Sequence, residues 1–521
     1  MTKRISAQAV KAALSAGGEI ALLDVREHGQ YGEGHPFFSV SVPFSRLEIE
    51  APRLVPRLAT SVVVFDDADG VAERASAQLK SLGFSDVAVL EGGAPAWASA
   101  GYVLFKGVNL PSKAFGELVE HALGTPHICA QTLNKWSGEN ADMVILDGRS
   151  PGEYTKMSIP GARSCPNAEL GLRIPDLVAS AQTTIVVNCA GRTRSIIGAE
   201  NLRVLGLPNP IVALENGTQG WQLAGFELNR GEAAAAFSPV SEAHAQLALS
   251  RAGALITRYE IPRVALDTLA TWRTQERSLY VLDVRTAEEF ATGRLPNSVH
   301  APGGQLAQST DQWVGVRGAR IVLVDDYEVR AALTARWLRG MGHDAYIAKV
   351  TRADLCDTAT QTPSIAVPTV SELGAPEVAR RIETGARVLD VSSSSAYRDV
   401  HLAVSVWAIR PRLAEHGLGA SDTVLLVAED LEVAALVAKD LRAAQVTVAG
   451  VMLRDVAAWE SAGLAVERCD SALSNAQCID FLFFVHDRHE GNMEAARAYL
   501  AWETGLIGQL DADERAVLDP R

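Results

Sequence analysis

The sequence predicts an α/β protein made of four tandem units, each a parallel sheet flanked by helices, followed by a mainly helical C-terminal tail. Short apolar runs alternate with segments of helical periodicity, a pattern typical of parallel sheets with helices on both faces. An acidic residue ends an apolar run four times, at Asp24, Asp147, Asp283 and Asp390. A second apolar run ends 42 residues later in the first three cases and 39 residues later in the fourth. Such a recurring spacing indicates repeated copies of one structural unit.

The repeats divide the chain into units one to four and a tail. Trp97, Trp221 and Trp459 follow the second apolar run in units one, two and four, whereas unit three lacks this tryptophan. A chain of 521 residues is long enough for several separate cores. We expect unit one at 1–105, unit two at 125–235, unit three at 258–353, unit four at 367–467 and the tail at 468–521.

Composition and charge exclude several functional classes. A net charge of −14 and a pI near 5.4 argue against nucleic acid and anionic membranes as partners. No apolar run reaches the roughly 18 residues of a membrane span, and the N-terminal residues lack the hydrophobic stretch of a signal peptide. The six cysteines include no CxxC pair, which fits a reducing compartment and argues against a disulfide framework or a structural zinc site. We therefore expect a cytoplasmic protein that requires no metal or organic cofactor.

One cysteine stands where a strand, a basic loop and a helix meet. The run from Ile185 to Val187 predicts a buried strand, and Ser195 before an apolar stretch predicts a helix N-cap. Cys189 therefore lies on a strand-to-helix turn, where backbone N–H groups, the positive helix end and two arginines favour a thiolate and hold an anion. The alternative is a small hydrophobic residue that ends a core strand. Cys189 is the predicted nucleophile, and the predicted substrate-binding loop consists of Ala190, Gly191, Arg192, Thr193, Arg194 and Ser195.

The repeats help to separate residues of the fold from residues of the chemistry. Asp147 and Arg149 recur in units that lack the cysteine, so we expect them to be structural. Glu169 and Arg173 belong to unit two alone, and they either form an ion pair on a helix surface or line the pocket and select the substrate. Cys165 is either a buried small residue or a thiol that resolves a persulfide of Cys189.

The motifs of unit two occur in a specific order. They are Asp147-Gly-Arg-Ser-Pro-Gly-Glu-Tyr, Ile159-Pro-Gly-Ala, the Cys189 loop and Glu215-Asn-Gly-Thr-Gln-Gly-Trp. In this order they resemble a rhodanese domain, the sulfurtransferase module. The loop from Cys189 to Arg194 counts six residues, the size that the family uses for sulfane sulfur, whereas the related phosphatases and arsenate reductases use seven.

The resemblance implies a sulfurtransferase of the thiosulfate sulfurtransferase type. Sulfane sulfur would pass from thiosulfate, a small persulfide or a mercaptopyruvate-type donor through a Cys189 persulfide to a thiol or cyanide. The partners would be a small donor and a thiol acceptor, with a protein acceptor as a further possibility. The alternatives are a rhodanese-fold phosphatase or arsenate reductase, and a scaffold in sulfur relay whose inactive units dock partners.

The other three units are expected to be catalytically inactive. They place Asp66, Asp325 and Glu429 at the position of the nucleophile, and a carboxylate cannot form a persulfide. The acidic loops that follow Asp66 and Asp325 predict that these units have also lost the anion site. Familiar two-domain rhodaneses pair an inactive unit with an active one, so the resemblance implies that units one and two pack as a pair.

Overall fold

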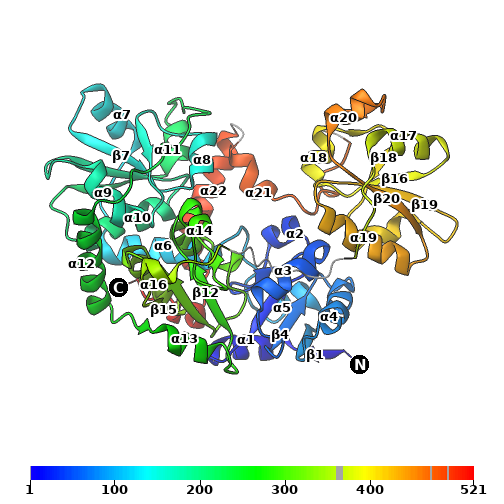
Figure 1. Ribbon diagram of the computed structural model, residues 1–521, viewed down its shortest axis with the longest axis horizontal. Coiled ribbons are helices and arrows are strands. Elements are labelled where there is room, and N and C mark those ends of the chain that lie inside the picture. Colours follow the sequence, from blue (N-terminus) through cyan, green and yellow to red (C-terminus); the bar gives the residue numbers. More distant parts are fainter. Residues whose placement is uncertain (1, 359–367, 470–471, 490–491, 521) are drawn as a thin grey trace.

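The computed structural model describes residues 2–358, 368–469, 472–489 and 492–520. Figure 1 shows four bodies of sheet and helix, coloured from blue for unit one to orange for unit four. In space the units follow the order two, three, one, four. The predicted fold class, parallel sheets flanked by helices with a helical tail, is confirmed.

Units one to three share one sheet topology. Each sheet has five parallel strands, in the orders β1-β5-β4-β2-β3, β6-β10-β9-β7-β8 and β11-β15-β14-β12-β13. The central strands are apolar because helices cover both faces of each sheet. Unit one consists of β1 (Lys3–Ile5), α1 (Ala7–Ser15), β2 (Ala21–Asp24), α2 (His28–Glu33), β3 (Val40–Ser41), α3 (Leu47–Leu54), β4 (Val62–Phe65), α4 (Val71–Ser81), β5 (Val87–Leu90) and α5 (Gly93–Ser99).

Long helices connect the first three units. Between units one and two lies α6 (Leu110–Leu123), and between units two and three lies α12 (Glu242–Arg258). Unit two consists of β6 (His127–Ile128), α7 (Ala130–Gly138), β7 (Met143–Asp147), α8 (Pro151–Lys156), β8 (Ala162–Ser164), α9 (Leu170–Leu177), β9 (Thr184–Asn188), α10 (Thr193–Val204), β10 (Ile211–Leu214) and α11 (Gly217–Leu223). Unit three consists of β11 (Arg263–Val264), α13 (Leu266–Trp272), β12 (Leu279–Asp283), α14 (Ala287–Thr292), β13 (Val299–His300), α15 (Gly303–Gln308), β14 (Arg320–Val324), α16 (Val329–Gly340) and β15 (Asp344–Ala348).

Unit four has the same topology with a shorter sheet. Its strands follow the order β18-β16-β19-β20, and a parallel bridge from Glu372 to Val451 lies where the other sheets have their outermost strand. A small antiparallel ribbon of β17 and β21 adjoins it. The unit consists of α17 (Ala375–Glu383), β16 (Arg387–Asp390), α18 (Ser394–Asp399), β17 (His401–Leu402), β18 (Ser405–Trp407), β19 (Thr423–Ala428), α19 (Leu431–Ala443), β20 (Thr447–Leu453), α20 (Val456–Ser461) and β21 (Val466–Glu467).

Strand pairing corrects one position predicted from the sequence. Asp390 pairs with Val427 as Asp147 pairs with Asn188, so Ala428 and not Glu429 occupies the position of Cys189. The sequence pattern predicted Glu429 because Ala428 continues the apolar run and Glu429 is acidic, like Asp66 and Asp325 in the other units. Unit four still has no nucleophile at this position.

The acidic residue that ends the first long strand has a structural role, as predicted. In unit two the buried Asp147 carboxylate accepts hydrogen bonds from Arg149 at 2.6 to 3.1 Å, and Arg149 also donates to a backbone carbonyl of the same unit. Arg26 and Arg285 bind Asp24 and Asp283 in the same way. This pair is therefore common to units with and without the cysteine.

Unit two packs against unit three, so the predicted pairing of units one and two is wrong. Trp337 of unit three donates a hydrogen bond to Asn201 of unit two at 2.7 Å. Leu333 of unit three lies so close to Gly171 that a Cβ there would approach the Leu333 Cδ1 to 2.9 Å, so the two units are in close contact at this position of α9. Unit one instead contacts unit four through Arg410, which binds Glu48 at 2.5 and 2.8 Å.

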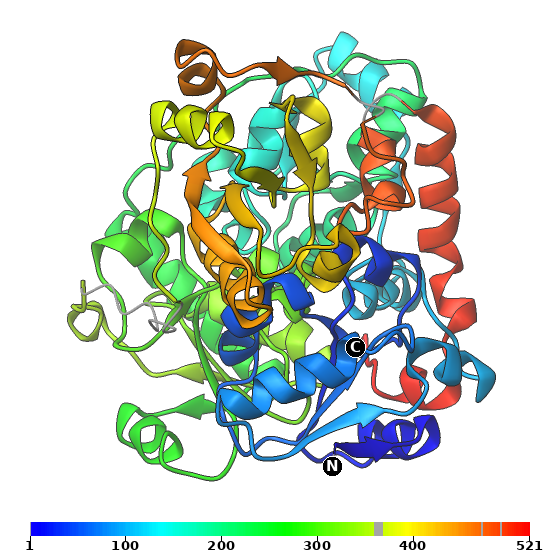
Figure 2. The ribbon, with the colours of Figure 1, turned by 90° about the vertical axis from the view of Figure 1, so that its right-hand side faces the viewer.

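The C-terminal tail touches all four units. After unit four it forms α21 (Phe483–His486), α22 (Met493–Gly505) and α23 (Ala512–Ala516). Ile479 accepts a hydrogen bond from unit one, Glu503 from unit two, and Asp519 donates to Gly340 of unit three. Figure 2 shows α22 in red beside units one and two. Within the described residues, no helix has the length and apolar character to cross a membrane, and no group of three or more His, Cys, Asp or Glu residues could hold a metal ion.

Candidate active site

Cys189 directly follows β9 and is 2% exposed. The backbone of the following turn is held to α11, where Thr218 N donates to Cys189 O at 2.8 Å. Helix α10 begins at Thr193, two residues before the predicted N-cap. Ser195 lies inside the first turn instead, and its hydroxyl donates a hydrogen bond to Cys189 Sγ at 3.1 Å. A donor at this distance stabilises negative charge on the sulfur.

Unit one shows what this type of loop binds. The carboxylate of Asp66, which stands at the position of Cys189, accepts hydrogen bonds from the backbone N–H groups of Ala68, Gly70 and Ala72 at 2.9 to 3.0 Å. Successive N–H groups that converge in this way form an anion site. The loop of unit one therefore keeps its amide donors, but they bind a carboxylate of the same loop, and the predicted loss of a site for a substrate anion stays a prediction.

Unit three repeats this arrangement. The carboxylate of Asp325 accepts from the backbone N–H groups of Tyr327, Arg330 and Ala331 at 2.8 to 3.2 Å. Here too the amides bind the unit's own carboxylate. Units one and three thus retain the amide geometry of the fold and differ from unit two in the residue that enters it.

Arg194 lies beside the sulfur but is not an isolated positive charge. Its guanidinium binds the carboxylate of Glu153 with two contacts of 2.7 Å. Burial opposes its charge, yet the negative charges of Glu153 and Cys189 hold the pKa of Arg194 above its ordinary value. Glu153 belongs to the N-terminal capping box of α8, in which Ser150 is the N-cap, so a local helix signal positions the partner of Arg194.

Arg192 points toward the connecting helix α6. It donates to Glu117 at 2.7 and 3.0 Å and also binds Glu120. These carboxylates, like Glu153, offset the positive charge that the sequence places in the loop. Binding of a donor anion by Arg192 and Arg194 stays a prediction.

The tail helix α22 covers the Cys189 loop, which the sequence did not predict. Glu503 is 1% exposed, and its Oε1 accepts hydrogen bonds from Thr193 at 2.9 Å and from Lys113 of α6 at 3.1 Å. Its Oε2 would lie 3.2 Å from a Cβ at Gly191. The sequence shows helical spacing along the tail at Ala496, Leu500, Glu503, Thr504 and Ile507, which predicts a helix but not what that helix contacts.

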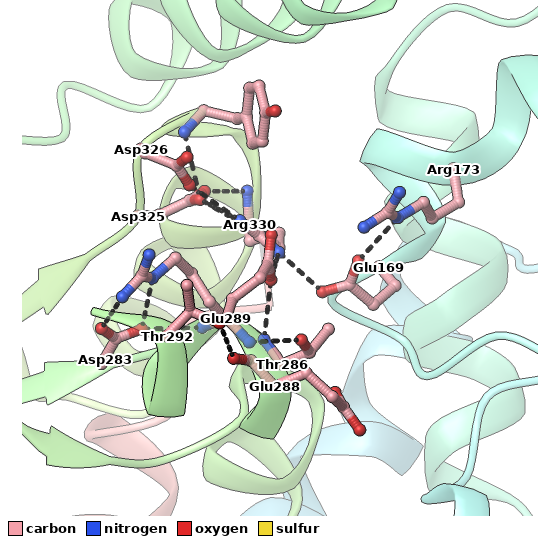
Figure 3. A network of polar contacts seen from close by, with 12 residues as sticks. Glu169, Arg173, Asp283, Thr286, Glu288, Glu289, Thr292, Asp325, Asp326 and Arg330 are labelled. Atoms are coloured by element: carbon pink, nitrogen blue, oxygen red, sulfur yellow. Dashed lines mark hydrogen bonds and ion pairs between the residues drawn. The ribbon is translucent and has the colours of Figure 1, made fainter. Parts of the chain in front are cut away.

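Glu169 and Arg173 lie in the contact between units two and three. They bind each other at 3.1 Å, and Glu169 also accepts from the fully buried Arg330 of unit three at 3.0 Å (Figure 3). Arg173 further donates to the carbonyl of Ser238 at 2.8 Å. The ion pair offered as one of the two alternatives is therefore present, but it is buried in this interface and does not lie on the helix surface. A role of the two residues as walls of the substrate pocket stays a prediction.

Cys165 is fully buried, as one of the two predicted alternatives requires. Burial and the nearby charge of Glu169 raise the pKa of its thiol well above the ordinary value. A thiol in this state is a poor nucleophile at neutral pH. Its chemistry therefore favours a packing role.

Comparisons with known proteins agree with this geometry. The family profile described as Rhodanese-like domain matches residues 6–100, 130–224 and 266–349. A crystal structure of a thiosulfate sulfurtransferase from Pseudomonas aeruginosa is 39% identical, with 99% of each chain covered and a TM-score of 0.91. The structure of the Alr3790 protein from Anabaena sp. is 27% identical, covers 20% of this chain and 83% of its own, and has a TM-score of 0.19. A search of curated proteins gave no match. The family profile does not extend to unit four, whose membership stays a prediction based on its strand order.

Proposed function

The chain belongs to the family of rhodanese-like domain proteins and is a sulfurtransferase, and on this premise we propose that it transfers sulfane sulfur through a persulfide of Cys189. The observation that carries the proposal is the Cys189 turn. A sulfur atom stands there at the position where units one and three bind a carboxylate with three backbone N–H groups.

The first half-reaction loads the enzyme. The Cys189 thiolate attacks the outer sulfur of thiosulfate, a new S–S bond forms, and the bond to the sulfonate sulfur breaks as sulfite leaves with the electron pair. The terminal sulfur of the persulfide carries the negative charge. The N–H groups of residues 190 to 194 and the Ser195 hydroxyl stabilise this charge, in the way that the equivalent amides stabilise Asp66.

The second half-reaction transfers the terminal sulfur of the Cys189 persulfide to an acceptor. A thiolate or cyanide attacks the terminal sulfur, and Cys189 leaves as a thiolate, so neither step needs a metal or organic cofactor. Small persulfides and mercaptopyruvate-type compounds are further donors of the same chemistry. Arg194 supplies positive charge for the donor anion from beside the sulfur, with Glu153 fixing the orientation of its guanidinium.

Intact mass after incubation with thiosulfate tests the proposal. The protein should gain about 32 Da, one sulfur atom, and cyanide should remove it. Cys189→Ser should gain nothing, while the matched control Cys356→Ser, at an exposed cysteine just after unit three, should load like wild type. Loading of Cys189→Ser to the wild-type extent would overturn the assignment.

The alternative of a phosphatase or arsenate reductase is tested by the same variants. A six-residue loop leaves little room to surround a tetrahedral oxyanion, so hydrolysis of an aryl phosphate should be negligible beside persulfide formation. Robust hydrolysis that disappears in Cys189→Ser would favour the alternative.

A further inference from the structure

The junction of units two and three joins equivalent segments of the two repeats. Asp147 pairs with Ser164 of β8, and Asp283 pairs with His300 of β13, so Ser164 and His300 occupy the same position of the fold. The residues that follow these two strands can therefore be compared one by one.

Glu169 and Gln305 are equivalent in this comparison, since each lies five residues after that position. Their segments lie directly against each other at the junction. A Cβ at Gly304 would approach the backbone nitrogens of Asn167 and Ala168 to 3.2 and 3.3 Å. The side chains of Glu169 and Gln305 are thus placed to reach across the junction in opposite directions.

Both units carry the same pair of an arginine and a glutamate. The arginine stands five residues after the nucleophile position, at Arg194 in unit two and at Arg330 in unit three. Arg194 binds Glu153 of α8 with two contacts of 2.7 Å, and Arg330 binds Glu289 of α14 at 2.6 Å. Each glutamate belongs to the capping box of its helix, so the same local signal positions it in both units.

The residues that reach this pair from the opposite unit differ in charge. Glu169 of unit two binds Arg330 directly at 3.0 Å (Figure 3). Gln305 of unit three instead donates from Nε2 to Oε2 of Glu153 at 3.2 Å. Within the described residues Arg194 is bound by one carboxylate, that of Glu153. Arg330 is bound by four carboxylates, those of Glu169, Glu289, Asp325 and Asp326.

A glutamine at position 305 has two consequences for Arg194. Its N–H group holds Oε2 of Glu153, and Glu153 in turn orients the guanidinium beside Cys189. The glutamine also adds no charge. A glutamate in its place would bring a second carboxylate to Arg194, as Glu169 brings one to Arg330, and would weaken the attraction of Arg194 for an anion.

We propose that Gln305 of unit three is a positioning residue for the reaction of unit two, because it orients the pair of Glu153 and Arg194 without adding negative charge. Arg194 thereby keeps an attraction for an anionic sulfur donor that four carboxylates cancel at Arg330. The proposal rests on the transfer of sulfur through Cys189, and it gives unit three a part in that reaction although unit three has no nucleophile.

Alkylation of Cys189 in the full-length protein tests the charge beside its sulfur. Iodoacetate is an anion and iodoacetamide is neutral, and both react with the same thiolate. The ratio of their rates at Cys189, followed by peptide mass analysis, therefore measures the attraction of the site for an anion. Gln305→Glu should lower this ratio at least about fivefold. The ratio at the exposed Cys356 of the same protein should not change.

Steady-state kinetics with thiosulfate test the same charge in the reaction. Gln305→Glu should lower kcat/KM at least about tenfold, mainly through a higher KM, because thiosulfate is a dianion. Gln305→Met keeps the length of the side chain without its N–H donor, and should raise KM and lower the alkylation ratio by about two- to threefold. The control Gln275→Glu adds the same charge at an exposed position before β12, at the opposite end of the sheet, and should behave like wild type.

The alkylation ratio decides the proposal. An unchanged ratio in Gln305→Glu would overturn it even if KM rose, because a change in KM alone would report a general distortion of the junction. If Gln305→Glu does not fold, as judged by its melting temperature, Gln305→Met decides in its place, and a wild-type ratio in that variant would overturn the proposal. Absence of sulfur transfer by the wild-type protein would instead refute the function proposed for Cys189, and the alkylation ratio would still test Gln305.

Discussion

Thr193 of the catalytic loop donates a hydrogen bond of 2.9 Å to Glu503 of the tail, 310 residues later in the sequence. The carboxylate also binds Lys113, and all three side chains are buried. The catalytic loop of unit two is therefore held by the connecting helix α6 and the tail helix α22, in addition to its own sheet.

Glu503→Ala should lower both stability and sulfur transfer. Loss of the carboxylate leaves the buried Lys113 without its ion-pair partner, which should cost about 3 to 5 kcal/mol. The loop should also lose its orientation, and we expect kcat/KM for thiosulfate to fall about 10- to 100-fold. Thermal unfolding and steady-state kinetics measure the two effects, with Glu494→Ala, at an exposed position of the same helix, as the control.

A double variant separates the two effects. Lys113→Met with Glu503→Leu removes both charges and should restore the melting temperature without restoring the rate. Wild-type kinetics in a stable double variant would show that the tail has no part in positioning the loop.

Arg194→Ala should reduce kcat/KM for thiosulfate about 100- to 1000-fold, because the guanidinium beside Cys189 would no longer stabilise the donor anion and the persulfide. Arg194→Lys should recover only part of the rate, since an ammonium cannot make both contacts with Glu153. Initial rates over a range of thiosulfate concentrations measure kcat/KM for the two Arg194 variants. The control is Arg163→Ala, an exposed arginine of β8, and a rate equal to that of the control would remove Arg194 from the catalytic site.

Asp66→Asn should destabilise the protein by about 1 to 3 kcal/mol while leaving sulfur transfer unchanged. The amide offers one acceptor oxygen to three backbone N–H groups that now share a carboxylate. Chemical denaturation measures the change, with Glu91→Gln at an exposed position of unit one as the control. Unchanged stability would show that the anion site of unit one contributes nothing to folding.

Glu27 should make stability depend on pH near neutrality. Burial raises its pKa from 4.5 to about 7, and the charge of Asp480 adds to this, while Ser45 and Arg410 oppose it. The folded state therefore binds the proton more tightly, so this contribution is present below pH 4.5 and is lost as pH rises to 7. Relative to Glu27→Gln, wild type should lose about 3 kcal/mol over this range. Parallel pH profiles of the free energy of unfolding would contradict the prediction.

Local signals explain why the sequence predicted much of the fold and the strand-to-helix turn at Cys189. A strand buried between helices must be apolar along its whole length, so β2, β7, β12 and β16 were recognisable without any partner. The Cys189 turn was recognisable for the same reason, because its strand, its loop and its helix are consecutive. In unit four the residue equivalent to Cys189 was predicted one residue too late, at Glu429 and not at Ala428. The apolar run of a strand does not fix its register, which depends on pairing with β16.

The sequence by itself determined the repeated α/β units, the strand-end Asp147 with Arg149, and the one unit with a cysteine at the turn. Tertiary structure alone decided that unit two packs on unit three, that Glu169 serves this interface, and that α22 covers the catalytic loop. The reason is physical. Strand and helix periodicity arise from neighbours within a few residues, whereas a contact between Thr193 and Glu503 depends on the shape and charge of surfaces that exist only after the units have folded.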